Sequence, residues 1–559
     1  MVQRLINYFH KEFGSLHQAA LLLGAAGIGA DILALARDRL FASIFGAGRE
    51  LDLYFAAFRV PDLIYTLTLL FAANTAIIPI LLKRIETDEE GAQRFFGGLM
   101  VIFLVFTVVL SAVAFIAMPY LIPFIAPGFI ETDAASVVLL ARIMLLSPIL
   151  LGLSNLVSSI VQSYRRFFVY ALSPIFYNIG IIAGILIFYP VLGIAGLGWG
   201  VALGAALHLL IQLPSVVRLG FVPHLRFQGL RADILAVMKL SLPRTAGLSL
   251  NQLTTTAVTA LASLFAAGSI AVFNFAQNLQ SVPLSVVGLS YSVAAFPTLA
   301  RLFVANRREE FIASVAMAMR HIILWSIPIS VLFIVLRAQI VRVVLGSGAF
   351  SWADTRLTAA AFLLFSLSIL SQSIVMLFVR ALYAAGRTTL PLLINLFASA
   401  ITVLLALLFV NLSSGGRVYE LFLNILRVAD VSGAAMLVLP LAVSLGSILN
   451  ALALVAGFNM IFGVNIFKNY WRALLEIAAA SALCGALTYL ALRVFAGVFD
   501  LETFVGVFAQ GLFAGGLGIA ALVAVLRTLR NAEFMEIWEA LHERFWHAEV
   551  LASEPESIK

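Results

Sequence analysis

The 559-residue sequence contains a single cysteine, and this scarcity excludes several kinds of chemistry. Cys484 lies in an apolar stretch and has no second thiol with which to form an intramolecular disulfide or a metal cluster. The histidines His208, His224 and His321 are isolated from one another, and no carboxylate pair accompanies a nucleophile. A glycine-rich phosphate-binding loop is also missing. We therefore expect neither an enzyme nor an ATP-driven pump, and we expect no cofactor and no metal site.

Charge is scarce as well. Only 11% of the residues are charged and 62% are hydrophobic, and the mean hydropathy is +1.06, which excludes a soluble globular protein. The net charge of +7 does not indicate a nucleic-acid partner, because the basic residues gather on one side of the predicted membrane. With the N-terminus in the cytoplasm, the inner loops and tails hold about 20 Lys and Arg and the outer loops about 7. This bias predicts a multi-pass membrane protein with both termini in the cytoplasm.

What the chain does have is a series of long apolar runs. Fourteen of them reach about 20 residues, enough to cross roughly 30 Å of hydrocarbon. They lie near 17–37, 53–82, 97–120, 135–161, 168–189, 192–215, 233–265, 269–299, 312–336, 357–382, 389–411, 432–462, 473–496 and 503–526. The fold class that we predict is therefore an all-α polytopic membrane protein with about fourteen transmembrane helices. We expect amphipathic interfacial helices at 1–16 and 531–546, the second with Phe534 on its apolar face and Glu533 on the opposite, polar face. We also expect outer-surface helical hairpins at 337–356 and 412–431.

An internal repeat divides these spans. Phe41-Ala-Ser-Ile-Phe-Gly-Ala-Gly48 is echoed about 220 residues later by Leu261-Ala-Ser-Leu-Phe-Ala-Ala-Gly268, and Asn178 is similarly echoed by Asn395. A repeat of this length holds about six spans, so both copies have the same orientation in the membrane. We predict two pseudo-symmetric six-helix lobes at 1–230 and 231–465, followed by two C-terminal helices at 466–530. The remaining residues, 531–559, form a cytoplasmic tail.

Ionisable residues within the spans mark the candidate site, because each costs at least ~2.5 kcal/mol to insert and usually lines a pathway or pairs with another charge. The densest group lies in the first copy of the repeat and includes Arg37, Asp52 and Arg59. Guanidinium groups suit a phosphorylated ligand, because they donate bidentate hydrogen bonds and stay charged. The alternative is internal pairing, of Arg37 with Asp52 or Asp31 and of Arg59 with Asp62.

The second copy of the repeat supplies fewer charges. Arg244 follows a proline within the seventh span and is a candidate for the cavity, with snorkelling or pairing as the alternative. Asn274 and Asn278 belong to a group of polar residues on the seventh and eighth spans. Such residues either line a cavity or form hydrogen bonds between helices.

Several motifs together carry a family resemblance that extends over nearly the whole chain. They are Arg37-Asp-Arg-Leu-Phe-Ala-Ser-Ile-Phe-Gly-Ala-Gly48, Asp52-Leu-Tyr-Phe-Ala-Ala-Phe-Arg-Val-Pro-Asp62, Ser163-Tyr-Arg-Arg-Phe167, Asn274-Phe-Ala-Gln-Asn-Leu279 and Arg380-Ala-Leu-Tyr-Ala-Ala-Gly-Arg-Thr-Thr-Leu-Pro391. The combination resembles the MurJ/MviN family of lipid II flippases, in the multidrug/oligosaccharidyl-lipid/polysaccharide exporter superfamily.

The resemblance implies a monomeric transporter of the bacterial inner membrane. Two lobes alternate between inward-open and outward-open states, and two further helices help form a groove for a polyprenyl tail. By position, Arg37, Asp52 and Arg59 match charged cavity residues of the family, and the cations would hold the pyrophosphate of an undecaprenyl-linked glycan. The substrate-binding set that we predict is Arg37, Asp52, Arg59, Arg244 and Asn278.

The chain departs from the family pattern at several cavity positions. Asp31 stands where the family has another arginine, Tyr65-Thr66 replaces a pair of arginines, and Asn278 and Ser281 replace an arginine and a glutamate. The function that we predict is movement of lipid II from the inner to the outer leaflet by alternating access, with membrane lipids as the other partners. The alternatives are a flippase for another polyprenyl-linked oligosaccharide, a cation-coupled drug exporter of the same superfamily and a non-transporting scaffold.

Overall fold

The computed structural model describes residues 16–72, 74–131, 133–164, 166–221, 231–413, 415–468 and 470–546. Within these ranges all regular elements are helices and no strand occurs, which confirms the predicted all-α class. The predicted helix at 1–16 lies outside the described residues.

The membrane spans largely follow the apolar runs. Eleven helices of the described chain are long and apolar enough to cross a membrane, or twelve if the consecutive helices α18 (Trp352–Ser366) and α19 (Ile369–Ala384) form one broken span. The other two predicted spans coincide with α2 (Leu16–Phe45) and α13 (Arg231–Ala262), which have 30 and 32 residues but carry several charged side chains. The multi-pass architecture is therefore confirmed, and the count of fourteen stays a prediction.

The chain forms two compact units, which are described separately. The first consists of Met1–Val282, Val341–Phe365 and Arg387–Asn450. Besides α2, α13 and α18 its helices are α3 (Arg49–Ala57), α4 (Arg59–Ala72), α5 (Asn74–Thr87), α6 (Glu89–Ile125), α7 (Ala134–Met144), α8 (Leu146–Ser163), α9 (Phe167–Ala183), α10 (Tyr189–Leu192), α11 (Ile194–Leu210), α12 (Leu213–Val217), α14 (Ser269–Pro283), most of α17 (Arg337–Leu345), α20 (Thr389–Leu412), α21 (Arg417–Leu426) and the first half of α22 (Val438–Phe462). The predicted lobes at 1–230 and 231–465 are a division by repeat and stay a prediction.

Glycines decide how closely two helices of the first unit pack. Gly180 and Gly184 follow each other at a spacing of four residues and lie against Gly204 and Gly200 of α11. A methyl group at Gly180 would lie 2.2 Å from the Cα of Gly204, so the two backbones touch only because both positions lack side chains. Lipid tails provide no hydrophobic drive for helices to associate, and small residues allow the close van der Waals contact that does.

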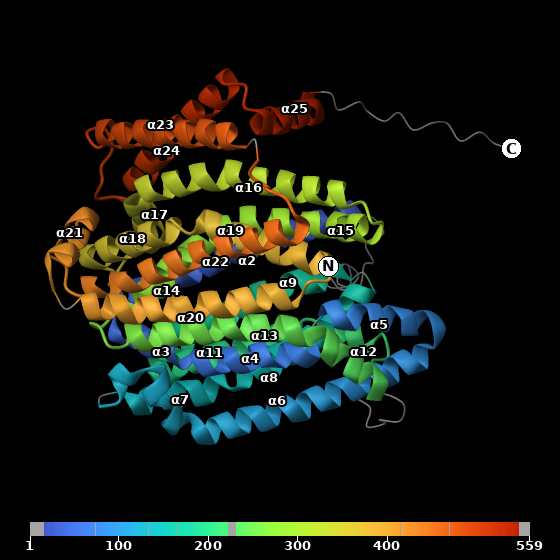
Figure 1. Cartoon of the computed structure of the whole chain (residues 1–559). Helices are drawn as coiled ribbons and strands as arrows, with labels where there is room; N and C mark the ends of the chain where they lie inside the picture. Colours follow the sequence, from blue (N-terminus) through green and yellow to red (C-terminus); the bar gives the residue numbers. More distant parts are fainter. Residues whose placement is uncertain are drawn as a thin grey trace. The chain divides into compact units, whose positions relative to one another are not determined.

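The second unit consists of Pro283–Ile340, Ser366–Gly386 and Ala451–Lys559. Its helices are α15 (Ser290–Val304), α16 (Arg308–Val335), α19, the second half of α22, α23 (Trp471–Phe495), α24 (Phe504–Thr528) and α25 (Ala532–Trp546), together with the π-helical turn Leu284–Leu289. Figure 1 shows α23 and α24 side by side. They pack through Gly518, whose added methyl group would lie 2.0 Å from the hydroxyl of Thr488.

The tail helix predicted at 531–546 is present as α25, and one detail of its predicted faces is wrong. Phe534 is buried as expected for the apolar face, but Glu533, assigned to the opposite polar face, is buried as well. The reason is an ionic partner, because a carboxylate oxygen of Glu533 lies 3.9 Å from a guanidinium nitrogen of Arg320 on α16. The helix therefore packs against its own chain through both an apolar and a charged side chain.

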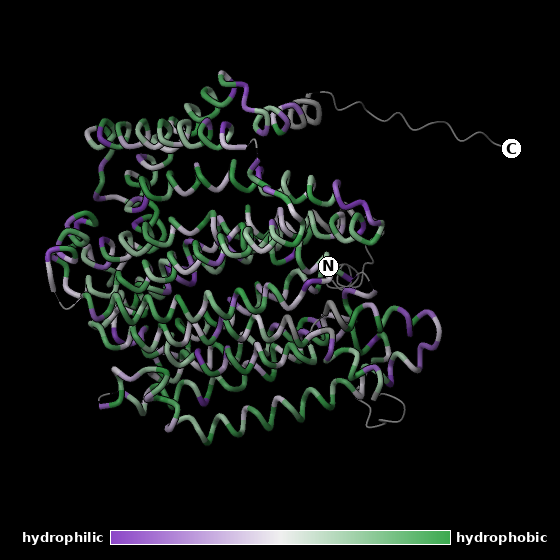
Figure 2. The backbone as a smooth tube through the Cα atoms, viewed as in Figure 1, coloured by the Kyte–Doolittle hydropathy of each residue, from purple (hydrophilic) through white to green (hydrophobic). Residues whose placement is uncertain are grey.

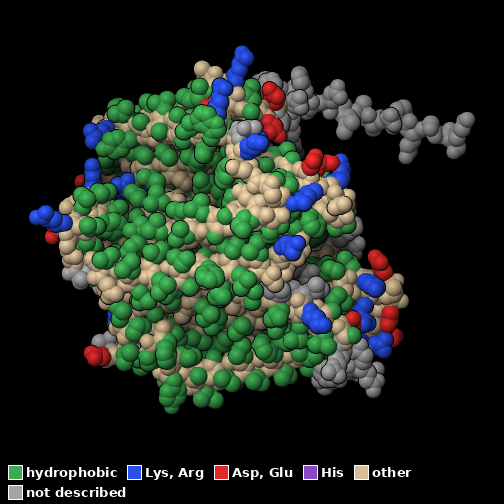
Figure 3. All heavy atoms as spheres, in the orientation of Figure 1, with side chains coloured by type: hydrophobic (Ala, Val, Ile, Leu, Met, Phe, Trp, Pro, Cys, Tyr) green, Lys and Arg blue, Asp and Glu red, His purple; other side chains and the backbone are tan. Residues whose placement is uncertain are grey.

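Hydrophobic side chains cover the outside of the helices as well as the interior. Figure 2 shows apolar residues along most of each helix and hydrophilic residues mainly near the ends, and in Figure 3 the charged side chains gather near the same ends. On α6, for example, Val105, Val109, Ile116 and Phe124 are exposed large apolar side chains. Exposed apolar residues along whole helices are what a lipid environment requires.

The segment 412–431 does not form the expected hairpin. It forms one short helix, α21, which follows the glycine pair Gly415-Gly416. Both glycines have positive φ, of 137° and 120°, a region that other residues rarely adopt, so the chain can turn sharply between α20 and α21.

Candidate functional site

Charged side chains from α2, α3 and α4 converge on one helix, α14. All of these elements belong to the first compact unit. Their contacts are made at residue 268, directly before α14, and at residues 271, 274 and 278 within it, which are spaced by three or four positions. Residues at this spacing share one face of a helix, so α14 turns a single polar face towards the charges.

Asp52 caps the start of α14. It is 1% exposed, and its two carboxylate oxygens accept hydrogen bonds from the main-chain N–H groups of Gly268 at 2.6 Å and Ala271 at 2.8 Å. The first N–H groups of a helix have no partner within that helix, and its N-terminus carries a partial positive charge. The Asp52 carboxylate therefore caps α14 although it comes from another helix, α3. These hydrogen bonds offset the cost of burying the carboxylate.

Arg59 is buried in contact with the same face. It is 6% exposed, and its Nη2 donates a hydrogen bond of 2.9 Å to the side-chain oxygen of Asn274. Its Nε is buried and has no hydrogen-bond partner among the described residues. The alternative partner, Asp62, interacts with Arg59 electrostatically, but no ion pair within 4.0 Å joins the two in the described part of the chain. A buried guanidinium with an unused donor is suited to bind an anionic oxygen, because a charge-assisted hydrogen bond offsets the cost of burying the cation.

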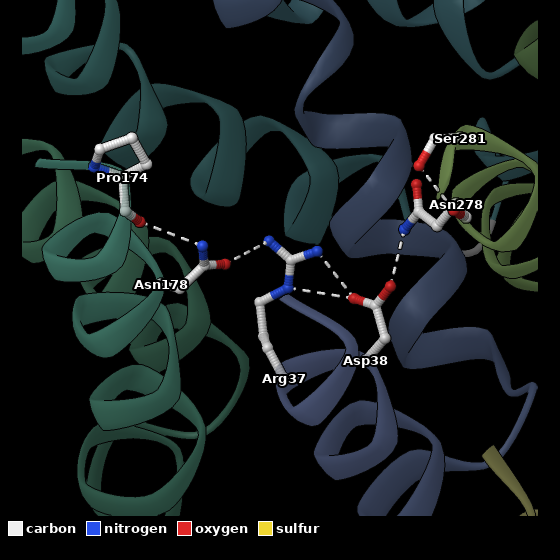
Figure 4. A network of polar contacts seen from close by, with 6 residues as sticks. All are labelled: Arg37, Asp38, Pro174, Asn178, Asn278 and Ser281. Carbon is white, nitrogen blue, oxygen red and sulfur yellow. Dashed lines mark hydrogen bonds and ion pairs between the residues drawn. The ribbon is translucent and has the colours of Figure 1, made fainter. Parts of the chain in front are cut away.

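Arg37 belongs to a hydrogen-bonded chain that joins three helices (Figure 4). Its guanidinium donates to Asp38 at 3.0 and 2.7 Å and to the side-chain oxygen of Asn178 on α9 at 3.0 Å. The other oxygen of Asp38 accepts a bond of 2.9 Å from Asn278 on α14. The pairing of Arg37 with Asp31 or Asp52 that the sequence left open is therefore wrong, because the neighbouring carboxylate of Asp38 lies closer than either.

Contacts to main-chain groups join the same parts of the chain. The Ala349 N–H donates to the Ser43 carbonyl at 2.8 Å, and Arg39 donates to the Val343 carbonyl at 2.6 Å. Gly268 has φ of 90°, and a methyl group there would lie 1.9 Å from the carbonyl oxygen of Ala47. These contacts join residues 39–59, in the first copy of the repeat, to residues 268–278 and 343–349 in the second. We call this set of contacts the repeat interface.

Four of the five predicted site residues are thus placed by the structure. Arg37, Asp52, Arg59 and Asn278 all belong to the polar contacts around α14. The side chain of Arg244 lies outside the described part of the chain, although α13 continues through this position.

Three residues of the site were not among the predicted five. Asp38, Asn178 and Asn274 each accept a hydrogen bond from an arginine. The sequence carries a signal for two of them, because Asp38 directly follows Arg37 and Asn178 recurs in the repeat at Asn395. Asn274 could be found only as a member of the polar group on the seventh and eighth spans.

Comparisons with known proteins agree with one another. A family model described as "Lipid II flippase MurJ" matches residues 41–509. A probable lipid II flippase MurJ of Buchnera aphidicola subsp. Acyrthosiphon pisum (strain APS) is 29% identical over 371 residues, which cover 66% of this chain and 73% of the relative. A probable lipid II flippase MurJ of Rhizobium tropici is 28% identical over 408 residues, or 70% of this chain and 75% of the relative.

Solved structures show the same fold. A lipid II flippase MurJ in an inward closed conformation has a TM-score of 0.71, with 20% identity over 91% of this chain and 99% of the other. An inward-facing transporter of the multidrug resistance MATE family has a TM-score of 0.60, with 14% identity over 79% of this chain and 96% of the other. At these identities the likeness extends to the fold alone.

Proposed function

Because the chain belongs to the MurJ family of lipid II flippases, we propose that it moves lipid II from the inner to the outer leaflet of the membrane. The observation that carries the proposal is the match of the family model over residues 41–509, most of the chain. The reaction is a transport step, in which no covalent bond forms or breaks. The site must therefore bind a charged headgroup, screen it from lipid and release it on the other side.

We assign recognition of the headgroup to Arg59 and Arg37. Lipid II carries a pyrophosphate between its polyprenyl tail and its sugars, and guanidinium groups bind such oxygens through paired, charge-assisted hydrogen bonds. The Nε of Arg59 is buried and has no hydrogen-bond partner among the described residues. The guanidinium of Arg37 is oriented by its hydrogen bonds to Asp38 and Asn178. Asn278, where the family pattern has an arginine, positions Asp38 through its amide and leaves fewer cations to bind the pyrophosphate.

We propose that the repeat interface is the closed side of an alternating-access cycle. Its contacts join the two copies of the repeat, and each must break for the copies to separate there. With the N-terminus in the cytoplasm, α2 ends at the outer surface, so the interface closes the outer side. Opening it removes the hydrogen bonds of Asp52 and Arg59 with α14, which frees Arg59 as the headgroup passes.

The membrane placement follows from the same sequence pattern. We propose a monomer in the bacterial inner membrane with both termini in the cytoplasm, supported by the excess of Lys and Arg in the loops on that side. Reporter fusions after residue 546 and within the 497–502 loop test it. A reporter that works only in the cytoplasm should be active after residue 546 and inactive in the 497–502 loop. A reporter that works only outside the cytoplasm should give the opposite result.

A reconstituted flipping assay tests the transport function. Purified protein in vesicles should move lipid II faster than protein-free vesicles do, and faster than it moves another undecaprenyl-linked glycan that lacks the peptide. Equal or better transport of the second lipid would assign the chain to other polyprenyl-linked saccharides. Absence of transport of either lipid would overturn the proposal.

Substituting Arg59 tests the assigned headgroup contact. Arg59→Ala should lower the flipping rate at least ~10-fold, because one charge-assisted hydrogen bond to a buried partner contributes about 1.5–3 kcal/mol. Arg59→Lys should recover part of the rate, since it keeps the charge but loses the paired geometry. Arg142→Ala is the matched control, because Arg142 is another arginine within a span, and it contacts Phe115 instead of α14. Unchanged transport in Arg59→Ala would remove Arg59 from the site.

A further inference from the structure

The short helix α21 has three different faces. One face packs into the first unit through Leu423 and Leu426, both of which are buried. A second face carries Arg417, Glu420 and Asn424, three polar residues at helical spacing. The third face is apolar and unpaired. It consists of Val418, Leu421 and Ile425, which are 84%, 61% and 69% exposed. We call Val418, Leu421 and Ile425 the apolar face of α21.

From these faces we infer that α21 is an interfacial helix whose apolar face is inserted between lipids of the membrane surface. A helix with separate polar and apolar faces, lying at the end of a span, binds the boundary between headgroups and acyl chains. This inference does not depend on which lipid the protein transports.

The adjoining span shows where the lipid boundary lies. On α20 the exposed residues Leu404, Leu408 and Leu412 follow one another at intervals of four, so they form a lipid-facing stripe up to the last residue of the helix. Gly415 and Gly416 then turn the chain directly into α21. Figure 1 shows α21 just beyond the ends of α20 and α22. The apolar face of α21 therefore begins where the stripe on α20 stops.

The helix is held in this place by the residues that follow it. Arg356 on α18 donates to both carboxylate oxygens of Asp430, at 2.7 and 2.6 Å, and also to the Arg427 carbonyl. Val428 is buried, and Gly433 lies against Ala266 in the loop before α14. Because these contacts fix the position of α21, the exposure of its apolar face is a property of the folded chain.

Lipid fits this face better than a protein partner does. A specific protein interface buries about 800 Å² on each side and involves some 20–30 residues, far more than three side chains. The segment 417–430 itself has no net charge, with Arg417 and Arg427 against Glu420 and Asp430. We therefore expect insertion to depend on apolar contact, with little dependence on anionic lipid.

Site-directed fluorescence tests the inference. In a Cys484→Ala background, Leu421→Cys places an environment-sensitive label on the apolar face, and Ile425→Cys repeats the measurement at a second position. Glu420→Cys is the matched control on the neighbouring polar face. Each labelled protein is placed in nanodiscs of phosphatidylethanolamine and phosphatidylglycerol, which leave both membrane surfaces open to solvent.

Two quenchers distinguish the outcomes. Lipid with a nitroxide near the headgroup should quench the label at Leu421 at least ~3-fold more than the label at Glu420, whereas aqueous iodide should show the reverse order. Nanodiscs of phosphatidylcholine alone should give the same pattern. Equal quenching of both labels by iodide would show a helix in water and overturn the inference. A label at Leu421 that is protected from both quenchers would show a covering protein, such as a second copy, and would overturn it as well.

Discussion

At the residue scale, the most informative side chain is Asp52. The sequence identifies it as a charge within a span, and the resemblance places it in a substrate cavity. The structure shows a carboxylate whose two oxygens are both used by main-chain donors of α14. A residue can thus be essential for transport by holding the closed state, without any contact with the substrate.

Replacing Asp52 by asparagine tests this role. The amide keeps the shape, but it loses the charge and presents a donor to one of the two N–H groups, which leaves that group unpaired. A hydrogen bond to a charged group contributes about 1.5–3 kcal/mol, so Asp52→Asn should destabilise the closed state by a similar amount. We expect a cysteine placed at Ser43 in a Cys484→Ala background to react faster with a water-soluble maleimide when Asp52→Asn is present.

Glu131→Gln is the control for that measurement, because Glu131 is exposed and distant in sequence from the repeat interface. An unchanged reaction rate in Asp52→Asn would mean that its two hydrogen bonds contribute nothing to closure.

The loop after α21 provides a prediction about pH. Hydrogen bonds from Arg356 lower the pKa of Asp430 from 3.8 to about 2. A carboxyl group with a lowered pKa in the folded state stabilises that state above its ordinary pKa, and the contribution is lost as the pH falls from 3.8 through about 2. Amide hydrogen exchange of residues 427–433, relative to the intrinsic rates, should therefore stay constant near neutral pH, where the pair is intact, and rise in strong acid. Asp430→Asn should exchange faster at neutral pH and lose that rise.

The site could be predicted from the sequence only in part, and the division has a physical cause. Arg37, Asp52, Arg59 and Asn278 were identifiable because polar groups are costly in hydrocarbon, so their presence alone is informative. Asp38 and Asn178, the partners of Arg37, carried a signal in the sequence, but the partners of Asp52 and Arg59 did not, because they are fixed by how α3, α4 and α14 pack. For Asp52 the partner is the main chain of another helix, which has no signature in residue types.

At the element scale, the glycines of α9 and α11 are packed more closely against their neighbours than a glycine of α13 is. Gly180 packs directly on Gly204, whereas a methyl group at Gly247 in α13 would meet no atom within 4 Å. The same substitution therefore has opposite expected effects in two membrane helices.

Gly180→Ala should lower thermal stability in detergent, because the added methyl forces two backbones apart. Overpacking of this kind costs about 1–3 kcal/mol. Gly247→Ala should leave stability unchanged or raise it slightly, since alanine has the higher helix propensity. Equal melting temperatures for the two variants would show that α9 and α11 can separate without loss.

At the scale of the whole molecule, the fold class was predictable and the number of spans was less so. The two predicted spans outside the eleven or twelve are α2 and α13, and α13 carries Asp233, Lys239 and Arg244. A search for apolar segments is weak at a helix such as α13, because its charged groups reduce the hydropathy on which the search depends. The repeat compensates for this weakness, since it identifies α2 and α13 as matching elements.

A reversible cross-link tests whether the repeat interface must open during transport. The main-chain hydrogen bond between Ser43 and Ala349 keeps the two backbones close enough for a disulfide. In a Cys484→Ala background, Ser43→Cys with Ala349→Cys should stop lipid flipping under oxidising conditions and regain it on reduction. Each single variant should flip normally in both conditions. Full transport by the oxidised double variant would show that this contact is not a gate.

The binding of Asp52 to main-chain groups has a consequence for how the family diverges. Any residue except proline supplies an N–H, so positions 269–271 are free to drift without a compensating change at Asp52. Pairs of positions that mutate together in alignments will therefore not reveal this contact, although it joins the two copies of the repeat. A statistical map of coupled substitutions would therefore miss the contact of Asp52, although it could show the side-chain pairs of Arg59 with Asn274 and of Asp38 with Asn278.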